Sequence, residues 1–316
     1  MTLRLVGDVG GTNCRFALVD PSDPDAEVVD PEAFKVADHA TLEDAIDHYL
    51  EGADGRPTEA VIAVAGPVID GKAELTNARW DMSEASLIDH GFAAARLLND
   101  YEALVLSVKR LRAKDLADIG DVRATHPKGT VAIVGAGTGL GVGALVRDAR
   151  GDAAAVTEGG HIAFAPTDDT EIEVLKFLTA RFGRVSLERI LSGPGLVNLY
   201  GALAQIGGQT AEDLKPEDIE ARAEQGDALA TQTLKRFCRI YGAAAGDYAL
   251  AFGALGGVYL GGGIAGKILD QLRAGDFREG FEDKGRFRDY CAAIPTKAIL
   301  HPYAALLGAA AADVAH

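Results

Sequence analysis

Two short hairpins are predicted where apolar runs flank glycine-rich turns in the chain. Each consists of a strand-like run, a tight turn and a second strand-like run. Their limits are residues 3–6, 7–12 and 16–19 in the first hairpin, and residues 131–134, 135–139 and 140–146 in the second. This pattern predicts a hairpin and not the strand-to-helix entry of a dinucleotide fold. One such hairpin alone is equally compatible with an ordinary turn, but two placed about 130 residues apart indicate a duplicated unit that clamps a nucleotide between two lobes.

The rest of the first lobe has the pattern of strands that alternate with helices. Thr41 to Asp44 resembles a capping box, with Asp44 in place of Glu, and opens an amphipathic helix that ends at Gly52. The elements expected after it are strands at 60–65 and 96–98 and a helix that runs from residue 99 to about residue 111. The polar segment 114–128 is irregular in pattern, and we expect a lobe boundary there.

The second lobe is predicted to become rich in helices after its hairpin. The expected elements are helices at 171–182, 185–191, 196–206 and 229–252, strands at 257–260 and 297–300, and an Ala-rich helix at 303–314. Gly193-Pro194-Gly195 is expected to separate two of these helices, and a further helix follows the glycine triplet 261–263. The predicted class is α/β, with residues 1–113 and 299–316 in a small lobe and residues 114–298 in a large one.

Composition and charge narrow the function classes. The chain has 316 residues, of which 48% are hydrophobic and 25% charged, as in ordinary globular proteins. A formal net charge of −16 argues against nucleic acid as a partner. We find no apolar run long enough to span a bilayer and no basic-plus-apolar leader, so we expect a cytoplasmic protein with no membrane partner. Cys14, Cys238 and Cys291 lack paired spacing, which predicts free thiols and neither a disulfide framework nor a structural zinc site.

The two hairpin turns have the chemistry of a phosphate site. Glycine lets the backbone approach a bound group closely, so that its N–H groups form a nest for phosphate oxygens. Each turn also carries a hydroxyl, on Thr12 and Thr138, and the first turn carries Asp8, a carboxylate suited to a hydrated magnesium ion. Backbone amides and a metal ion would allow even this acidic chain to bind a polyphosphate.

A third glycine-rich segment, residues 261–267, comes close to two well-known sequence motifs, but neither assignment holds. It satisfies G-x-G-x-x-G, but about fifty residues remain after it, too few for the rest of a dinucleotide domain. It also misses the P-loop spelling, because Ile268 stands where Ser or Thr would hold magnesium. We interpret Gly261, Gly262 and Gly263 as the wall against which an adenosine lies. Close packing between a strand and a helix is the alternative.

Five polar residues are candidates for a site that binds and activates an alcohol. Asp100 is suited to accept the proton of a hydroxyl that attacks phosphorus, and Asn99 to position that alcohol, although both residue types are also common helix caps. Glu158, His161 and Glu188 could surround a polyhydroxylated ligand with acceptors. Singly, Glu188 is equally typical of a solvated helix face and His161 of an ordinary satisfied polar residue. Glu158 and His161 could ligate zinc, but no further His or Cys stands at ligand spacing.

A family resemblance connects these motifs. The segments that carry it, in order from residue 6 to residue 287, are VGDVGGTNCRFALVD, LLNDYEAL, VGAGTGLGVGAL, TEGGHIAFAP, RVSLERILSGPGLVNLY, GGVYLGGGI and FEDKGRF. Together they resemble the bacterial ATP-dependent glucokinases, which belong to the hexokinase/actin-like ATPase superfamily. The resemblance covers nearly the whole chain.

The resemblance implies a fold and a reaction. It implies the two-lobed hexokinase/actin-like (ribonuclease H-like) fold with a cleft between the lobes, and a closing helix that returns to the first lobe. It implies transfer of the γ-phosphoryl group of ATP to the 6-hydroxyl of D-glucose at the entry to glycolysis, by a cytoplasmic homodimer. The residues implied for glucose are Asn99, Asp100 (the catalytic base), Glu158, His161 and Glu188. Those implied for ATP are Asp8 (through hydrated Mg²⁺), Gly10, Gly11, Thr12, Asn13, Gly137, Thr138, Gly261, Gly262 and Gly263.

One departure separates this chain from the related repressor-type sugar kinases. Those proteins carry a Cys-rich zinc motif after the E-x-G-H element, whereas residues 163–169 here contain no cysteine. The departure favours the glucokinase branch without a structural metal, and the start of the chain at the kinase hairpin argues against a transcription factor. A kinase for fructose or mannose and a non-catalytic sugar-binding regulator remain as alternatives, although the presence of Asp100 weighs against the regulator.

Overall fold

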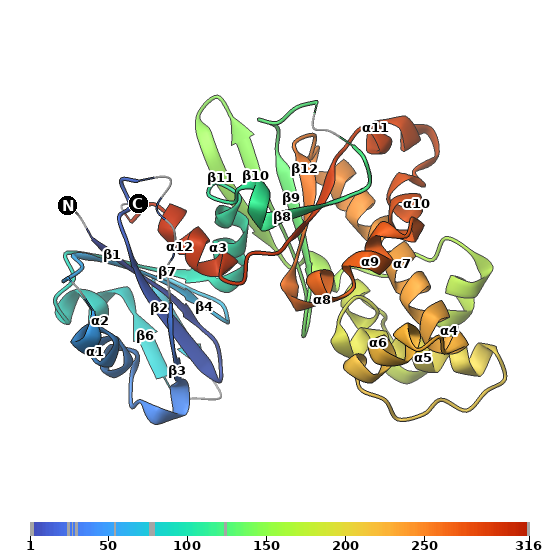
Figure 1. Ribbon diagram of the computed structural model, residues 1–316, viewed down its shortest axis with the longest axis horizontal. Coiled ribbons are helices and arrows are strands. Elements are labelled where there is room, and N and C mark those ends of the chain that lie inside the picture. Colours follow the sequence, from blue (N-terminus) through green and yellow to red (C-terminus); the bar gives the residue numbers. More distant parts are fainter. Residues whose placement is uncertain are drawn as a thin grey trace. The chain divides into compact units, whose positions relative to one another are not determined.

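The computed structural model describes residues 3–23, 26, 28, 31–53, 55–75, 80–122 and 125–314. The chain divides into two compact units (Figure 1). Unit 1 contains Met1–Asp115 and His301–His316, and unit 2 contains Leu116–Leu300. Each unit has its own hydrophobic core.

A five-stranded sheet organises unit 1. Its order is β3-β2-β1-β4-β7, in which β1, β4 and β7 are parallel and β2 and β3 antiparallel. The strands are β1 (Arg4–Val9), β2 (Asn13–Val19), β3 (Glu32–Lys35), β4 (Glu59–Val64) and β7 (Ala94–Asn99). β1 and β4 are largely buried on both faces because helices cover both sides of the sheet. The first predicted hairpin is β1–β2, and the predicted strand at 60–65 is β4.

Two pairs of helices cover this sheet. Figure 1 shows α1 (Leu42–Gly52) and α2 (Glu84–Asp89) on one face, and α3 (Asp100–Ser107) and α12 (Ala304–Ala311) on the other. Gly308 of α12 lies so close to α3 that an added Cβ would overlap the carbonyl oxygen of Ala103. The structure thus confirms that the closing helix returns to the first lobe. Smaller elements of the unit are β5 (Lys72–Leu75), β6 (Trp80–Ser83), η1 (Val36–Asp38) and η2 (Ala113–Asp115).

A six-stranded sheet organises unit 2. Its order is β11-β10-β9-β12-β13-β8, with β9, β12 and β13 parallel. The strands are β8 (Leu116–Ile119), β9 (Val131–Ala136), β10 (Leu140–Asp148), β11 (Gly151–Thr157), β12 (Gly257–Gly261) and β13 (Thr296–Ile299). The first five strands in this order repeat the pattern of unit 1, two antiparallel strands beside three parallel ones. The duplication predicted from the two hairpins is therefore confirmed at the level of sheet topology.

Helices make up most of the rest of unit 2. They are α4 (Asp169–Phe182), α5 (Gly193–Ile206), α6 (Pro216–Glu224), α7 (Ala228–Phe252), α8 (Gly262–Lys267), α9 (Leu269–Arg273), α10 (Asp276–Glu282) and α11 (Arg288–Ala292). Three 3-10 turns accompany them: η3 (Gly159–His161), η4 (Leu187–Arg189) and η5 (Gly285–Phe287). The long helix α7 packs against β9 and β12 and also contacts α5, α6 and α10. It matches the helix predicted at 229–252.

Two predictions about unit 2 are wrong. The polar segment 114–128 is not irregular throughout, because β8 occupies Leu116–Ile119 and pairs antiparallel with β13. Charged Asp118 masks the inward alternation of Ala117 and Ile119 in the sequence. The helix expected at 185–191 is only the short turn η4, because Ser186 makes an extended bridge to Ala163.

Three helix ends also differ from prediction. Gly193-Pro194-Gly195 does not separate helices but forms the first turn of α5, where Ser192 accepts a hydrogen bond from the N–H of Gly195 at 3.0 Å. Proline fits there because the first turn of a helix needs no N–H donor. α3 ends at Ser107, whose carbonyl accepts from both Arg110 and Leu111. Thr41 caps α1 as predicted, but Asp44 accepts from Ala40 and not from Thr41.

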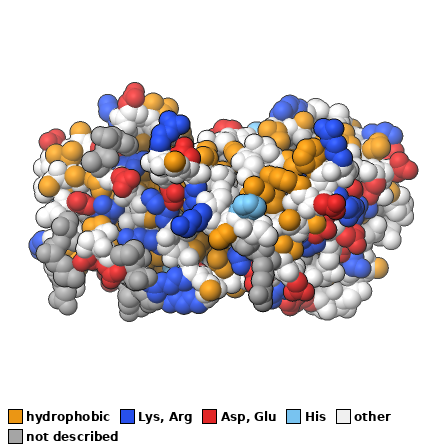
Figure 2. All heavy atoms as spheres, turned by 90° about the horizontal axis from the view of Figure 1, so that it is seen from above, with side chains coloured by type: hydrophobic (Ala, Val, Ile, Leu, Met, Phe, Trp, Pro, Cys, Tyr) orange, Lys and Arg blue, Asp and Glu red, His pale blue; other side chains and the backbone are white. Residues whose placement is uncertain are grey.

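The surface charges and the cysteine thiols do not point to a functional site. On the face drawn in Figure 2, acidic and basic side chains are interspersed, with hydrophobic side chains scattered among them. Within the described ranges, no helix is long and apolar enough to cross a membrane. The three cysteines are free and buried, as predicted.

Candidate active site

The carboxylates of unit 1 meet at one edge of its sheet. β1, β4 and β7 are parallel, with Val9, Val64 and Asn99 in register at their carboxyl ends. Asp8 lies one residue before this level, and Asp100 lies one residue after it. β4 alone separates their strands, and the charge of Asp8 acts on Asp100. The predicted proton acceptor and the predicted metal-binding carboxylate are therefore neighbours at the edge where ligands bind in such sheets.

Burial controls the protonation of both carboxyls. It raises the pKa of Asp100 above the ordinary value, the N–H of Tyr101 opposes this rise, and the charge of Asp8 adds to it. Burial also raises the pKa of Asp8, while Arg15 acts to lower it. A carboxylate with a raised pKa is a stronger proton acceptor, which is what a general base needs.

Arg15 is a residue of this site that the sequence interpretation missed. It stands opposite Asp8 in the β1–β2 register, and its Nη1 lies 3.6 Å from Oδ2 of Asp8. The signal was present in the sequence, because the hairpin fixes which residue faces Asp8 across the strands. Arg15 thus places a cation beside the carboxylate.

Asn99 has a structural task as well as a predicted binding task. Its Oδ1 accepts a hydrogen bond of 2.9 Å from the N–H of Tyr101 and so caps α3, the helix that begins with Asp100. Its Nδ2 donates to the carbonyl of Gly66 at 2.8 Å and so ties the exit of β4 to the start of α3. The helix-cap interpretation of Asn99 is therefore correct. A contact with an alcohol remains a prediction for this residue.

The glycines at three predicted nucleotide positions have no internal reason to be glycine. A Cβ on Gly10 or Gly137 would find its nearest neighbour at 3.6 and 4.0 Å, which is ordinary contact, and one on Gly263 would find nothing within 4 Å. None of the three is among the residues with a left-handed φ. Neither packing nor turn geometry therefore requires glycine there. The backbone at these three positions is therefore open to close approach by a ligand, and their contact with a nucleotide stays a prediction.

The second hairpin turn and the glycine triplet lie side by side in unit 2. Gly262 has φ +79°, and a Cβ there would overlap the carbonyl oxygen of Ala136 at the end of β9. The predicted alternative, close packing, is thus correct for Gly262 but not for its neighbour Gly263. The carbonyl of Gly137 accepts from the N–H of Gly193, the first residue of α5, at 2.8 Å. Thr138 lies exposed at the tip of the turn.

Three predicted sugar-binding residues come together in unit 2. His161 faces both carboxylates, with Nε2 3.8 Å from Oε2 of Glu158 and Nδ1 3.9 Å from Oε1 of Glu188. Their side chains are 58%, 92% and 32% exposed for His161, Glu158 and Glu188, so all three can meet a ligand. Within the described ranges, no cluster of three or more His, Cys, Asp or Glu has the arrangement of a metal site.

Glu188 joins this group to the glycine turn. Its Oε2 accepts a hydrogen bond of 3.0 Å from the N–H of Leu140, the first residue of β10. A Cβ on Gly139 would lie 2.6 Å from the same oxygen, so a side chain at the end of the turn would displace the carboxylate from this position. The solvated-helix interpretation of Glu188 is therefore wrong. Its carboxylate is held by the backbone between the two predicted subsites.

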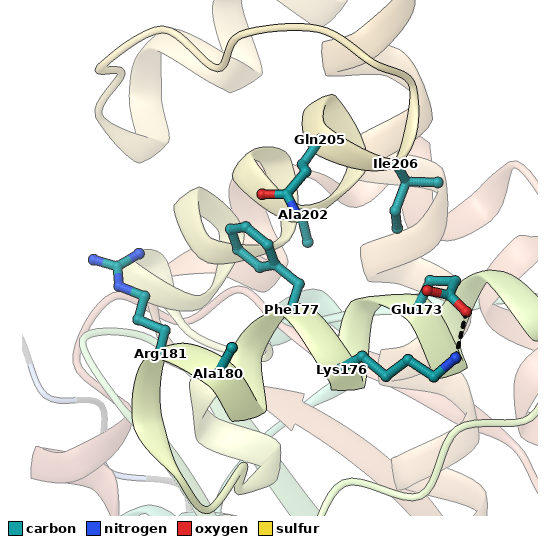
Figure 3. Close-up of a pocket in the computed structure, with 8 residues that line it drawn as sticks. All are labelled: Glu173, Lys176, Phe177, Ala180, Arg181, Ala202, Gln205 and Ile206. Carbon is teal, nitrogen blue, oxygen red and sulfur yellow. Dashed lines mark hydrogen bonds and ion pairs between the residues drawn. The ribbon is translucent and has the colours of Figure 1, made fainter.

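A separate pocket lies on the surface of unit 2 between α4 and α5. It has a volume of about 610 Å³ and is drawn in Figure 3. Its lining residues are Glu173, Lys176, Phe177, Ala180, Arg181, Ala202, Gln205 and Ile206. None of the predicted site residues lines it, and Lys176 pairs with Glu173 at 2.7 Å. The chemistry described above does not lie in this pocket.

Comparisons with known proteins assign the family. The family profile described as Glucokinase matches residues 5–316. A glucokinase of Caulobacter sp. (strain K31) is 50% identical over 312 residues, which cover 98% of this chain and 94% of the relative. The crystal structure of a glucokinase from an Antarctic psychrotroph has a TM-score of 0.93 at 36% identity and covers 98% of both chains. A ROK-family glucokinase from Streptomyces griseus, solved with glucose and AMPPNP, shares the fold with a TM-score of 0.61 at 22% identity over 98% of both chains.

These similarities confirm two predictions made from the motifs. The fold class is the two-lobed actin-like fold that sugar kinases of this kind share. The family match covers nearly the whole chain, as the resemblance did. The chain belongs to the glucokinase family of ATP-dependent glucose kinases.

Proposed function

We propose that this protein transfers the γ-phosphoryl group of ATP to the 6-hydroxyl of D-glucose, giving glucose 6-phosphate and ADP. One observation carries the proposal beyond family membership. The group Glu158, His161 and Glu188, which offers acceptors to ring hydroxyls, adjoins the glycine turn that is open to phosphate, through the bond from Leu140 to Glu188. A polyol subsite beside a phosphate subsite is what phosphoryl transfer to a sugar requires.

The proposed nucleotide subsite relies on open backbone. Gly10, Gly137 and Gly263 leave their backbone open to a ligand, and we assign to the ATP site also Gly11, Thr12, Asn13, Thr138, Gly261 and Gly262. The structure of the Streptomyces griseus glucokinase with AMPPNP supports a nucleotide on this fold. Backbone N–H groups fixed before the ligand arrives can stabilise the charge that develops on the transferring group.

The reaction then needs a base and a neutralised phosphate. The 6-hydroxyl oxygen attacks the γ-phosphorus, the bond from this phosphorus to the β–γ bridging oxygen breaks, and the hydroxyl proton passes to Asp100. Asn99 positions the alcohol beside Asp100. Asp8 fits the requirement for hydrated Mg²⁺, because it is a carboxylate at the carboxyl end of β1, and burial raises its pKa although Arg15 acts to lower it. When bound, Mg²⁺ would supply neutralisation of phosphate charge.

The proposal also covers pathway and assembly. A glucose kinase of this class feeds glycolysis, and the family resemblance implies a cytoplasmic homodimer. The other two candidate functions are a kinase for fructose or mannose and a sugar-binding regulator without catalysis. The Glu158–His161–Glu188 group favours glucose if the hydroxyl pattern of this sugar fits its acceptors. Direct measurement has to separate the three candidate functions.

A coupled assay over a hexose panel with ATP and Mg²⁺ tests the function. We expect kcat/KM for glucose to exceed that for fructose and mannose. Preference for one of those hexoses would support the second candidate. Sugar binding without turnover on any hexose would support the regulator and contradict the enzyme.

The Glu158→Ala variant is expected to raise the KM for glucose and to leave the KM for ATP nearly unchanged. The side chain of Glu158 is almost fully exposed, and the only described partner that it approaches is His161 at 3.8 Å, so its loss leaves the glycine turn intact. A site built to hydrogen-bond a hydroxyl loses about 10-fold or more when one charged partner is removed. Steady-state kinetics with each substrate varied in turn provides the measurement. A parallel rise in both KM values would argue against a sugar contact.

The pH profile is expected to show an acid limb that belongs to Asp100. The base must be ionised to accept the proton, and its pKa lies above the ordinary 3.8 because of burial and the charge of Asp8. Activity should therefore fall as the pH decreases through this raised value. The profile of kcat/KM measures it, with return to neutral pH as the control for unfolding. An acid limb at or below 3.8 would contradict the assignment.

A further inference from the structure

Two tyrosines of α7, Tyr241 and Tyr248, reach the backbone of two different functional turns. They stand seven residues apart, which is about two helical turns, so both point from one face of the helix. Their exposed fractions are 0% and 6%. A tyrosine buried to this degree needs a partner for its hydroxyl, and the choice of partner is therefore informative.

Tyr241 holds the strand that enters the glycine turn. Its hydroxyl donates to the carbonyl of Val134 at 2.8 Å and accepts from the N–H of Ala136 at 3.3 Å. Both groups belong to the last three residues of β9, directly before Gly137. The hydroxyl thus fixes the backbone from which the phosphate-facing turn departs.

Tyr248 holds the turn that carries two sugar-binding residues. Its hydroxyl donates to the carbonyl of Gly159 at 2.7 Å. Gly159 stands between Glu158 and His161, and its N–H donates to Oγ1 of Thr157 at 3.1 Å. Burial, with a smaller contribution from Asp247, raises the pKa of Tyr248 to about 12, so the hydroxyl remains a donor at neutral pH.

The helix itself is fixed by close packing against α10. A Cβ on Gly242 would overlap the carbonyl oxygen of Phe277, and one on Gly246 would overlap that of Phe281. From α10, Gly280 lies equally close to the carbonyl of Arg239. Helices that touch backbone to backbone cannot rotate or slide without losing this contact. α7 therefore presents the two tyrosines from a firm position.

We propose that α7 sets the geometry of both subsites, with Tyr248 as a positioning residue for the sugar and Tyr241 as a positioning residue for the nucleotide. The inference rests on the proposed function and extends it to two buried residues outside the predicted subsites. It predicts that removal of each hydroxyl changes the KM for a different substrate, although both tyrosines stand on one helix. A purely structural role predicts no such division.

Removal of each hydroxyl by a Tyr→Phe substitution tests the proposal, because the ring and its packing remain. Tyr248→Phe should raise the KM for glucose by about 5- to 50-fold, the size expected when a buried carbonyl loses its donor, and should change the KM for ATP less than about 2-fold. Tyr241→Phe should raise the KM for ATP and spare that for glucose. Tyr200→Phe is the matched control, since Tyr200 is also buried in unit 2 but its hydroxyl faces Arg222 and Glu212.

A second readout separates this proposal from the proposed function. Hydrogen exchange of the free protein should quicken at residues 158–162 in Tyr248→Phe, and at residues 136–139 in Tyr241→Phe. This division would support the positioning role even if the native protein failed to phosphorylate any hexose. Equal changes in both KM values for either variant, or exchange unchanged in both segments, would overturn it.

Discussion

The Asp100→Asn variant is expected to lose about 10²- to 10⁴-fold in kcat, the usual contribution of a general base. Asparagine keeps the size of the side chain but cannot accept the hydroxyl proton, so glucose binding should change little. Steady-state kinetics and calorimetric titration with glucose measure the two effects. Asp169→Asn is the matched control, because Asp169 is also the first residue of a helix, α4, and lies in no predicted subsite. Near-normal kcat in Asp100→Asn would leave Asp100 as a helix residue only.

The same variant is expected to unfold at a higher temperature. The pKa of Asp100 is raised in the folded protein, so the folded state favours the protonated form, and the ionised carboxylate destabilises the fold at neutral pH. Asparagine removes that charge. The difference in unfolding temperature between variant and native protein should become smaller as the pH falls through the raised pKa, because the native Asp100 then takes up its proton. Loss of activity together with higher stability would mark a residue kept for function and not for folding.

The Gly308→Ala variant is expected to destabilise unit 1 by about 3 kcal/mol, at the upper end of the usual cost of overpacking. The added Cβ would overlap the carbonyl oxygen of Ala103, and a backbone atom cannot move aside as a flexible side chain can. Denaturant unfolding followed by tryptophan fluorescence measures the effect. The sequence contains one tryptophan, Trp80, which lies buried in unit 1 and therefore reports on that unit.

Gly201→Ala supplies the control with the opposite sign, and its unfolding is followed by far-UV circular dichroism because Gly201 lies in unit 2, on which Trp80 does not report. Gly201 also lies inside a helix, α5, but a Cβ there would meet only Phe177 at 3.9 Å. Alanine should therefore stabilise this helix by up to about 1 kcal/mol through its higher propensity. If both substitutions stabilised the protein, the close contact between α12 and α3 would be contradicted.

Local sequence patterns predicted the helices and strands that are determined by residues within their own segments. The β1–β2 and β9–β10 hairpins, α4 and α7 follow from turn glycines and apolar periodicity within each segment. The candidate residues of each unit were chosen because they sit at strand ends or in distinctive motifs, and their roles stay predictions.

The missed features depend on partners far away in the sequence. β8 is a strand because β13 pairs with it, and Gly195 belongs to a helix because it fits against Ile190. No local sequence pattern singles out Tyr248, because its role depends on a hydrogen bond to a carbonyl on the turn that follows β11. Local pattern rules cannot weigh such tertiary contacts, which override propensity.

The return of α12 to unit 1 has a consequence for how the protein is made. Arg4, at the start of β1, donates to the carbonyls of Ala310 and Ala312, and α3 is covered by the same closing helix. On the ribosome, unit 1 therefore emerges early but stays without these partners until all of unit 2 has been synthesised. The surface of α3 that receives Gly308 is bare during this interval, and chaperones could bind it. The helix that begins with Asp100 gains its full support only late in translation, so an unfinished chain would hold its catalytic carboxylate on an incompletely packed scaffold.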